Sequence, residues 1–302
     1  MSILNNPSFV PASNLRIAIV GIIFAFVWSS AFIAGKIGMV ATGPLTLLCL
    51  RFLLAALLFV PIVRRFAPEV SLVRMDRQGF WLALASGLLT NAVYLGLTYT
   101  GMKSVPAGLT AILVSTNPLL TSLLASAWLK EPFGWRSAIG LLAGFAGVIG
   151  IMWERAGLFT ADGKGIVLIL IGTSALAAAT LVNRRAISHM SLWHIAFVQL
   201  LGSGLALLPV AIWLEGLAFA PNLAFFGSLI YQATVVSIGT TMMLLWLIRH
   251  GGASRASSFH LLNPVFGTLL AIGLLGEKVS ISEMIGVVPI VAGLALVLRR
   301  GK

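Results

Sequence analysis

The sequence predicts an all-α integral membrane protein with ten transmembrane helices, arranged as two inverted five-helix repeats around a central cavity. Three observations lead to this fold class. Hydrophobic residues make up 59% of the 302 residues, charged residues only 9%, and the mean hydropathy is +1.04, far outside the range of a soluble domain. An Asn-Pro pair with a following glutamate recurs along the chain. Basic residues collect in alternate loops, as in membrane proteins with a fixed orientation.

Ten apolar runs are long enough to cross the membrane, since about 30 Å of hydrocarbon requires a helix of about 20 residues. In the first half they lie near 16–35, 44–63, 79–101, 106–129 and 136–153, and in the second near 165–182, 192–214, 223–248, 252–275 and 281–298. Residues 1–15 show no signal-peptide features, so the first run is expected to remain as a span. Cys49 is the only cysteine, which excludes an intramolecular disulfide.

The chain contains an internal repeat. Asn117-Pro118 is followed by Glu131, and Asn263-Pro264 is followed by Glu277 at the same spacing, 146 positions later. The same step relates two pairs of glycines, Gly140 with Gly286 and Gly147 with Gly293. We therefore predict one repeat over 16–153 and a second over 165–298. With five helices in each, the second copy must cross the membrane in the opposite orientation.

The loop charges predict the orientation. Loops on the side of the N-terminus carry 14 of the 20 basic residues and loops on the opposite side carry 5, with Arg51 inside a span. By the positive-inside rule, the terminal segments 1–15 and 299–302 are cytoplasmic. The net charge of +12 then indicates topology and contact with anionic lipid, and not a nucleic-acid partner.

The third and eighth runs carry polar stripes that could line a pathway. In the third run the stripe consists of Ser86, Thr90, Asn91, Tyr94 and Thr98, and in the eighth of Gln232, Ser237, Thr240 and Thr241. Spacings of about four residues place such side chains on one helix face. Small hydroxyl residues also join helices by ordinary interhelical hydrogen bonds. The larger groups of Asn91 and Tyr94 are the stronger candidates for substrate contact.

Each Asn-Pro pair lies about halfway along an apolar run. A proline removes one backbone hydrogen bond and clashes with the carbonyl four residues earlier, here Val114 for Pro118 and His260 for Pro264. We therefore expect a kink or a looser turn in the fourth and ninth runs. Asn117 and Asn263 stand beside the freed carbonyls, where they could bind substrate or only repair the helix.

Several other polar residues lie within or beside the spans. His260 is deep in the ninth run and could bind substrate, carry a proton or simply bond to a neighbouring helix. Trp28 lies past the middle of the first run, deep for an interfacial anchor. Arg51 is interpreted as structural, with a side chain that snorkels or pairs. Glu131 and Glu277 at span ends are explained by helix caps or salt bridges.

The spans contain no aspartate, and glutamates occur only at their ends. No cluster suited to a metal, a cofactor or catalysis can be assembled, so an enzyme is not expected. Proton- and sodium-coupled carriers often use buried carboxylates. Transport is therefore expected to be downhill or by exchange.

Many short segments of this sequence resemble the sequence pattern of the drug/metabolite transporter superfamily, EamA type. In the first repeat they are Trp28-Ser29-Ser30-Ala31-Phe32, Lys36, Pro44, Arg51-Phe52, Leu97-Thr98-Tyr99-Thr100, Asn117-Pro118-Leu119, Leu129-Lys130-Glu131, Gly140 and Gly147. In the second they are Pro264, Gly276-Glu277, Gly286 and Gly293. The chain is also similar to YddG-like bacterial exporters of amino acids. It departs from the pattern at Gln199, where an arginine is expected, and at Leu176, opposite Trp28.

The resemblance implies ten helices in two inverted repeats and members that move amino acids, nucleosides or other small metabolites, often outward. We therefore expect an exporter or facilitator of amino acids, aromatic and other apolar ones favoured, that works by alternating access in a bacterial-type inner membrane. The expected substrate-binding residues are Trp28, Asn91, Tyr94, Tyr99, Asn117, His260 and Asn263, with Pro118 and Pro264 as hinges.

Alternative functions are export of nucleosides or cationic drugs, a membrane-embedded enzyme that acts on lipid, and a passive channel. The expected partners are a small-molecule substrate and membrane lipids. Neither a cofactor nor nucleic acid is expected, and a monomer is the favoured oligomeric state.

Overall fold

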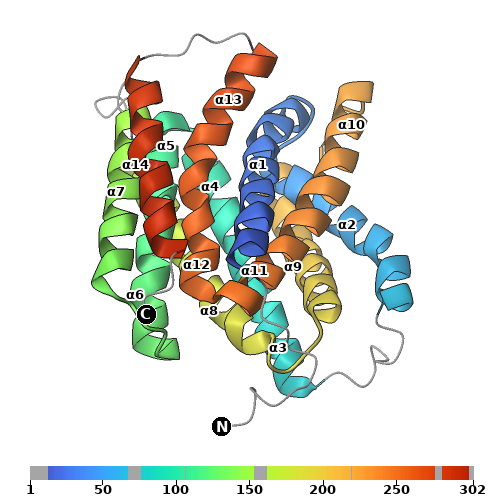
Figure 1. Cartoon of the computed structure of the whole chain (residues 1–302). Helices are drawn as coiled ribbons and strands as arrows, with labels where there is room; N and C mark the ends of the chain where they lie inside the picture. The colour runs from blue at the N-terminus through green and yellow to red at the C-terminus, as the bar shows by residue number, and fades with distance from the viewer. Residues whose placement is uncertain are drawn as a thin grey trace.

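A computed structural model describes residues 13–66, 76–105, 107–152, 162–218, 220–275 and 281–298. Residues 1–12 of the predicted segment 1–15, the predicted segment 299–302 and Glu277 lie outside these residues. The described chain folds into a bundle of helices whose axes are roughly aligned, with the chain passing back and forth between the two ends of the bundle (Figure 1). The start of the first helix and the end of the last lie at the same end of the bundle, the lower end in Figure 1.

The helices follow the predicted runs closely. In the first half they are α1 (Asn14–Met39), α2 (Pro44–Phe66), α3 (Arg77–Gly87), η3 (Leu88–Tyr94), α4 (Leu95–Gly101), α5 (Ala107–Val114), α6 (Asn117–Leu129) and α7 (Trp135–Met152). In the second they are α8 (Gly163–Ala186), α9 (Leu192–Glu215), α10 (Leu223–Tyr231), η4 (Gln232–Thr240), α11 (Thr241–Gly251), α12 (Ala253–Ser258), η5 (Phe259–Leu262), α13 (Asn263–Leu275) and α14 (Ile281–Leu298).

Among the described residues, seven helices are long and apolar enough to cross a membrane. They are Asn14–Met39, Pro44–Phe66, Arg77–Gly101, Leu109–Leu129, Gly163–Ala186, Leu192–Glu215 and Leu223–Gly251. Shorter apolar helices cover Trp135–Ile151 and Ile285–Leu298. The predicted run 252–275 is divided between α12, η5 and α13 and is not among these seven helices. Large apolar side chains such as Leu57 and Trp213 face outward, as expected of a surface in contact with lipid.

Both Asn-Pro pairs stand at helix interruptions, as their chemistry predicts. α5 ends at Val114 and α6 begins at Asn117, with Pro118 in its first turn. Proline is tolerated there because the first-turn N–H groups have no partner inside the helix. In the ninth run the chain passes through the 3-10 turn η5 and restarts as α13 at Asn263.

Two π-helical segments interrupt the third and eighth runs. η3 covers Leu88–Tyr94 and η4 covers Gln232–Thr240, and their ends at Tyr94 and Thr240 are separated by the repeat step of 146. The periodicity of the sequence did not predict them. π-helices are rare and occur frequently at functional sites. Both segments contain residues of the predicted polar stripes.

α7 and α14 pack side by side through their glycines (Figure 1). A methyl group added at Gly140 would lie 2.6 Å from the carbonyl oxygen of Gly293, and one added at Gly147 would lie 2.5 Å from that of Gly286. The contacts are crosswise, because each glycine touches the repeat counterpart of the other. Such a reciprocal pattern is typical of elements related by a two-fold axis. The glycine faces of the two helices therefore meet within the chain.

Two glutamates cap helices that are distant in sequence. Glu131, just past α6, accepts hydrogen bonds from the backbone N–H groups of Ala253 (2.9 Å) and Ser254 (3.2 Å) at the start of α12. Glu215, at the end of α9, accepts those of Leu45 (3.1 Å) and Thr46 (2.8 Å) at the start of α2. Negative charge at a helix N-terminus is stabilising. Both caps join neighbouring spans at the ends of the bundle.

Candidate functional site

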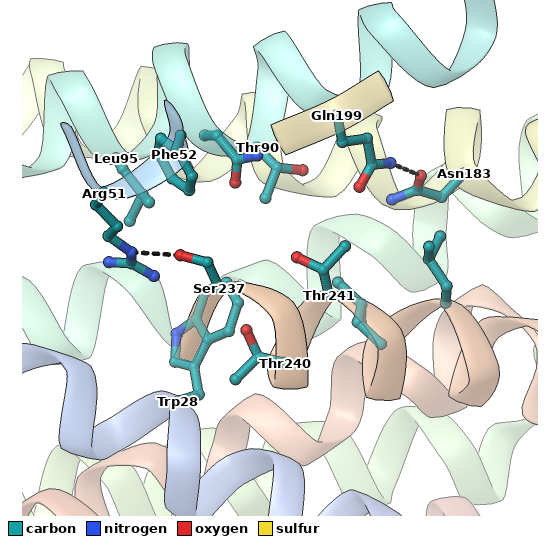
Figure 2. Close-up of a pocket in the computed structure, with 13 residues that line it drawn as sticks. Trp28, Arg51, Phe52, Thr90, Leu95, Asn183, Gln199, Ser237, Thr240 and Thr241 are labelled. Carbon is teal, nitrogen blue, oxygen red and sulfur yellow. Dashed lines mark hydrogen bonds between the residues drawn. The ribbon is translucent and has the colours of Figure 1, made fainter. Parts of the chain in front are cut away.

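A narrow cavity of about 20 Å³ lies among the central helices (Figure 2). It is lined by Trp28, Arg51, Phe52, Thr90, Asn91, Leu95, Asn183, Gln199, Ser237, Thr240, Thr241, Leu244 and Leu245. These residues come from α1, α2, η3, α4, α8, α9, η4 and α11, so both halves of the chain contribute. A volume of this size holds about one water molecule. The cavity is therefore closed around its polar groups.

Arg51 is the only charged residue among the described lining residues. Its side chain is buried, with 5% of the residue exposed. Nε donates to Ser237 Oγ at 2.7 Å and Nη1 donates to Gln232 Oε1 at 3.3 Å. The guanidinium carbon also lies 5.2 Å from the centre of the Phe52 ring. In the described part of the chain no carboxylate contacts this arginine, so the partners of its charge are neutral.

Gln199 stands on the opposite side of the cavity in Figure 2. Its Nε2 donates to Ser86 Oγ at 2.8 Å and to Asn183 Oδ1 at 2.6 Å. Gln199 lies 148 positions after Arg51, and Gln232 lies 146 positions after Ser86. The Gln199–Ser86 bond is thus the repeat counterpart of the Arg51–Gln232 bond. Amide groups face the cavity on one side and a cation faces it on the other.

An aromatic cluster forms the wall beside these polar groups. The Trp28 ring is stacked on Tyr94, with centres 6.5 Å apart and planes at 19°, and meets His260 edge-on at 5.0 Å and 78°. A hydrogen bond of 3.1 Å joins His260 Nδ1 and Asn263 Nδ2. His260 therefore packs against Trp28, and Asn263 is hydrogen-bonded to His260.

The structure separates the seven predicted substrate-binding residues into three groups. Trp28 and Asn91 line the cavity, and Asn91 Nδ2 donates to Ser203 Oγ at 3.2 Å. Tyr94 and His260 are buried and pack against Trp28. The remaining predicted residues are Tyr99, Asn117 and Asn263. They neither line the cavity nor stack against the Trp28 ring.

Asn117 and Asn263 each keep one buried polar atom without a partner among the described residues. Thr121 Oγ1 donates to Asn117 Oδ1 at 3.2 Å, but Asn117 Nδ2 and Asn263 Oδ1 have no hydrogen bond. Pro118 and Pro264, the predicted hinges, stand in the first turns of α6 and α13. Both amides lie at helix breaks and do not line the cavity.

Arg51, Gln199 and Asn183 line this cavity but are not among the residues predicted to bind substrate. Arg51 was expected to snorkel or pair, whereas it is enclosed and bonded to η4. The signal that could have identified it was the repeat, because positions 51 and 199 correspond and both carry long polar side chains in otherwise apolar runs. The partners of these side chains depend on helix packing, which no local pattern contains.

A second, wider cavity of about 930 Å³ opens at the end of the bundle where α6 ends and α12 begins. Its lining includes Glu131, Arg136, Arg184, Arg249, His250, Arg255 and Ser122. Arg184 Nη1 donates to the carbonyl oxygens of Ile248 and Arg249, both at 3.4 Å. We call this wider cavity the vestibule. Its lining carries more positive than negative side chains.

Across the described residues there is no group of three or more histidine, cysteine or acidic side chains that could hold a metal ion.

Comparisons with known proteins agree with this architecture. The sequence model of the EamA-like transporter family matches residues 15–153 and again residues 163–299. The uncharacterized inner membrane transporter YedA of Escherichia coli K12 is 28% identical over 290 residues, which cover 92% of this chain and 89% of that protein. The uncharacterized transporter YvbV of Bacillus subtilis is 26% identical over 289 residues, with 95% and 93% covered. A solved crystal structure with 18% identity superposes with a TM-score of 0.78 over 94% of this chain and 96% of its own.

Proposed function

The chain belongs to the EamA-like transporter family, and from this premise we propose that it exports amino acids across a bacterial-type inner membrane by alternating access. Its family and its relatives identify it as a multi-pass membrane transporter. The substrate class, the direction of transport and the mechanism are the proposed parts.

The observation that carries the substrate proposal is the mixture of groups in one cavity. Trp28 offers an aromatic surface, Asn91 and Gln199 offer amides, and Arg51 offers a cation. An amino acid with an apolar side chain has the matching parts, a polar head group and an apolar tail. A cationic drug is disfavoured, because the buried arginine would repel its charge. A nucleoside would leave the arginine without an opposite charge.

The closed cavity supports alternating access. Ligand pockets for small molecules usually measure about 300–1,000 Å³, far more than the 20 Å³ between Trp28 and Gln199. The substrate can enter only if the helices around it move apart. Because both halves line the cavity and α7 meets α14 crosswise, we propose that two inverted repeats rock against each other around this point. The vestibule of 930 Å³ is then the approach from one side.

Counterflow in proteoliposomes tests the proposal. Vesicles are loaded with L-phenylalanine, L-leucine, adenosine or ethidium, and uptake of the labelled compound is measured against empty vesicles. We expect counterflow with the amino acids. Counterflow with adenosine or ethidium alone would contradict the substrate class, and flux that never saturates would indicate a channel. Turnover of lipid without any flux would indicate an enzyme.

Two tryptophans, Trp28 in the cavity and Trp213 on the outer surface, supply a test variant and a control. Trp28→Ala removes an aromatic surface from the cavity, and we expect phenylalanine counterflow to fall roughly tenfold or more, since aromatic contacts contribute on the order of 1 kcal/mol beyond their buried area. Trp213 is 83% exposed, so Trp213→Ala should leave the rate unchanged. Equal rates for the wild type and Trp28→Ala would remove Trp28 from the site.

A further inference from the structure

We infer that Arg51 is the anchor for a carboxylate group of the transported molecule, so that the site accepts carboxylic acids and rejects their neutral or cationic amides. This inference rests on the proposed transport function and names the chemical group that selects the substrate. It assigns to the arginine of α2 a role different from the structural one that its sequence position suggested.

Arg51 is a charged residue buried inside a membrane-spanning helix. It lies seven residues after Pro44 at the start of α2, about 10 Å along the helix at 1.5 Å per residue, and is buried. A charged side chain inside a membrane is expensive and usually has a charged partner or a functional role. Arg64 and Arg65 in the last turn of α2 are exposed and fit an ordinary interfacial role. Arg51 has neither exposure nor, among the described residues, a carboxylate partner.

The hydrogen bonds of Arg51 leave one edge of the guanidinium free. Of its five N–H donors, Nε–H is taken by Ser237 and one hydrogen of Nη1 by Gln232. Nη2 forms no hydrogen bond with any described residue. The second hydrogen of Nη1 and both hydrogens of Nη2 therefore remain available to a ligand. Two parallel N–H groups match the two oxygens of a carboxylate, which is the strongest arrangement for arginine recognition.

Neighbouring side chains hold this edge in place. Gln232 Nε2 donates to Ser228 Oγ at 3.0 Å, and Ser228 Oγ donates to the carbonyl oxygen of Ala34 at 2.6 Å. The chain of bonds turns the oxygen of Gln232, and not its NH₂ group, toward Arg51. A guanidinium fixed by two acceptors is preorganised, so that binding of an anion costs little further ordering.

The rest of the cavity gives an anion one orientation. The repeat counterpart of Arg51 is the neutral Gln199, so the positive charge stands on one side of the cavity alone (Figure 2). A carboxylate would bind at that side, and the remainder of the molecule would reach toward Trp28 and Thr240. The positive lining of the vestibule, with Arg136, Arg184 and Arg249, would raise the local concentration of anions at the approach.

Competition between acids and amides tests this inference. Counterflow of labelled L-phenylalanine is inhibited with a set of amino acids, each paired with its primary amide, in wild type, Arg51→Gln, Arg51→Lys and the control Arg64→Gln. In the wild type we expect each acid to bind roughly tenfold or more tightly than its amide, the scale of a charge-assisted hydrogen bond. In Arg51→Gln the ratio should fall to about one, Arg51→Lys should retain part of it, and Arg64→Gln should match the wild type.

The outcomes separate this inference from the proposed function. If amino acids and their amides compete equally in the wild type, or if Arg51→Gln keeps the preference for the acid, the anchor role is wrong while amino-acid transport stands. If the protein exchanges adenosine but no carboxylic acid, both are wrong. A purely structural arginine would alter folding and rate without changing the ratio. Should Arg51→Gln fail to fold, the wild-type ratio and Arg51→Lys still decide.

Discussion

At the scale of single residues, Glu131 and Glu215 fasten the two ends of the bundle by the same chemistry. Each carboxylate accepts two backbone N–H groups from the first turn of a distant helix. A glycine precedes each capped turn. A side chain at Gly43 would collide with Glu215, and Gly252 adopts a positive φ of 85° beside Glu131, a conformation that favours glycine. Glu131, predicted from the sequence to form a helix cap or a salt bridge, forms both, because it caps α12 and its Oε1 lies 4.0 Å from Arg184 Nε.

The first prediction concerns Glu215. Glu215→Ala removes the acceptor of two N–H groups at the start of α2 and one hydroxyl bond from Thr46. We expect a loss of about 1–2 kcal/mol of stability, the usual value of a helix cap, and a melting temperature a few degrees lower in detergent. Thr42→Ala is the matched control. Its hydroxyl bonds the carbonyl oxygen of Ala218 in the same junction but is exposed, so equal losses in both variants would contradict the cap.

At the scale of elements, local chemistry was predictable and packing was not. The breaks before Asn117 and Asn263 follow from the proline that comes next in the sequence. The π-helical segments η3 and η4 did not follow, because the hydrogen-bond register of a helix depends on what packs beside it. The sequence identified Trp28 and Asn91, which line the cavity. It left open whether Arg51 snorkels or pairs, because its partners Ser237 and Gln232 on η4 are set by helix packing. The predicted residues Tyr99, Asn117 and Asn263 do not line this cavity.

The second prediction concerns the contact between α7 and α14. Gly147→Ala places a methyl group 2.5 Å from the carbonyl oxygen of Gly286, so the helices must separate. We expect a loss of about 1–3 kcal/mol, the usual cost of overpacking, measured as a lower melting temperature. A methyl group at Gly134 meets no atom of the described residues within 4 Å, and Gly134→Ala should therefore melt like the wild type. An unchanged melting temperature for Gly147→Ala would show that this contact is loose.

At the scale of the whole molecule, charge and symmetry lead to the same proposed topology. The 14 basic residues predicted on one side outnumber the 5 on the other, and by the positive-inside rule this excess predicts that both termini are cytoplasmic. In the structure, the start of α1 and the end of α14 lie at the same end of the bundle (Figure 1). The basic vestibule lies at the end of α6, with Val297 of α14 in its lining. On this proposed topology, the vestibule would open to the cytoplasm, the side from which an exporter takes up its substrate.

The third prediction tests that orientation by cysteine labelling. In a Cys49→Ser background, Ala220→Cys lies in the loop before α10 and Gly134→Cys in the loop before α7, both at exposed positions. We expect a membrane-impermeant maleimide to label Ala220→Cys in intact cells and Gly134→Cys only after the membrane is permeabilised. The reverse pattern would invert the topology and place the vestibule outside.

The crosswise contacts between α7 and α14 couple the evolutionary histories of the two halves. Gly140 touches Gly293 and Gly147 touches Gly286 through backbone atoms, so a larger residue in either copy of the duplicated segment immediately meets the other copy. The halves have diverged at Arg51 and Gln199 and at Trp28 and Leu176, where each residue faces its own surroundings. At the four glycines, a larger residue in one half requires a compensating change in the other half. Among relatives, these positions should remain small or be replaced in compensating pairs across the duplication.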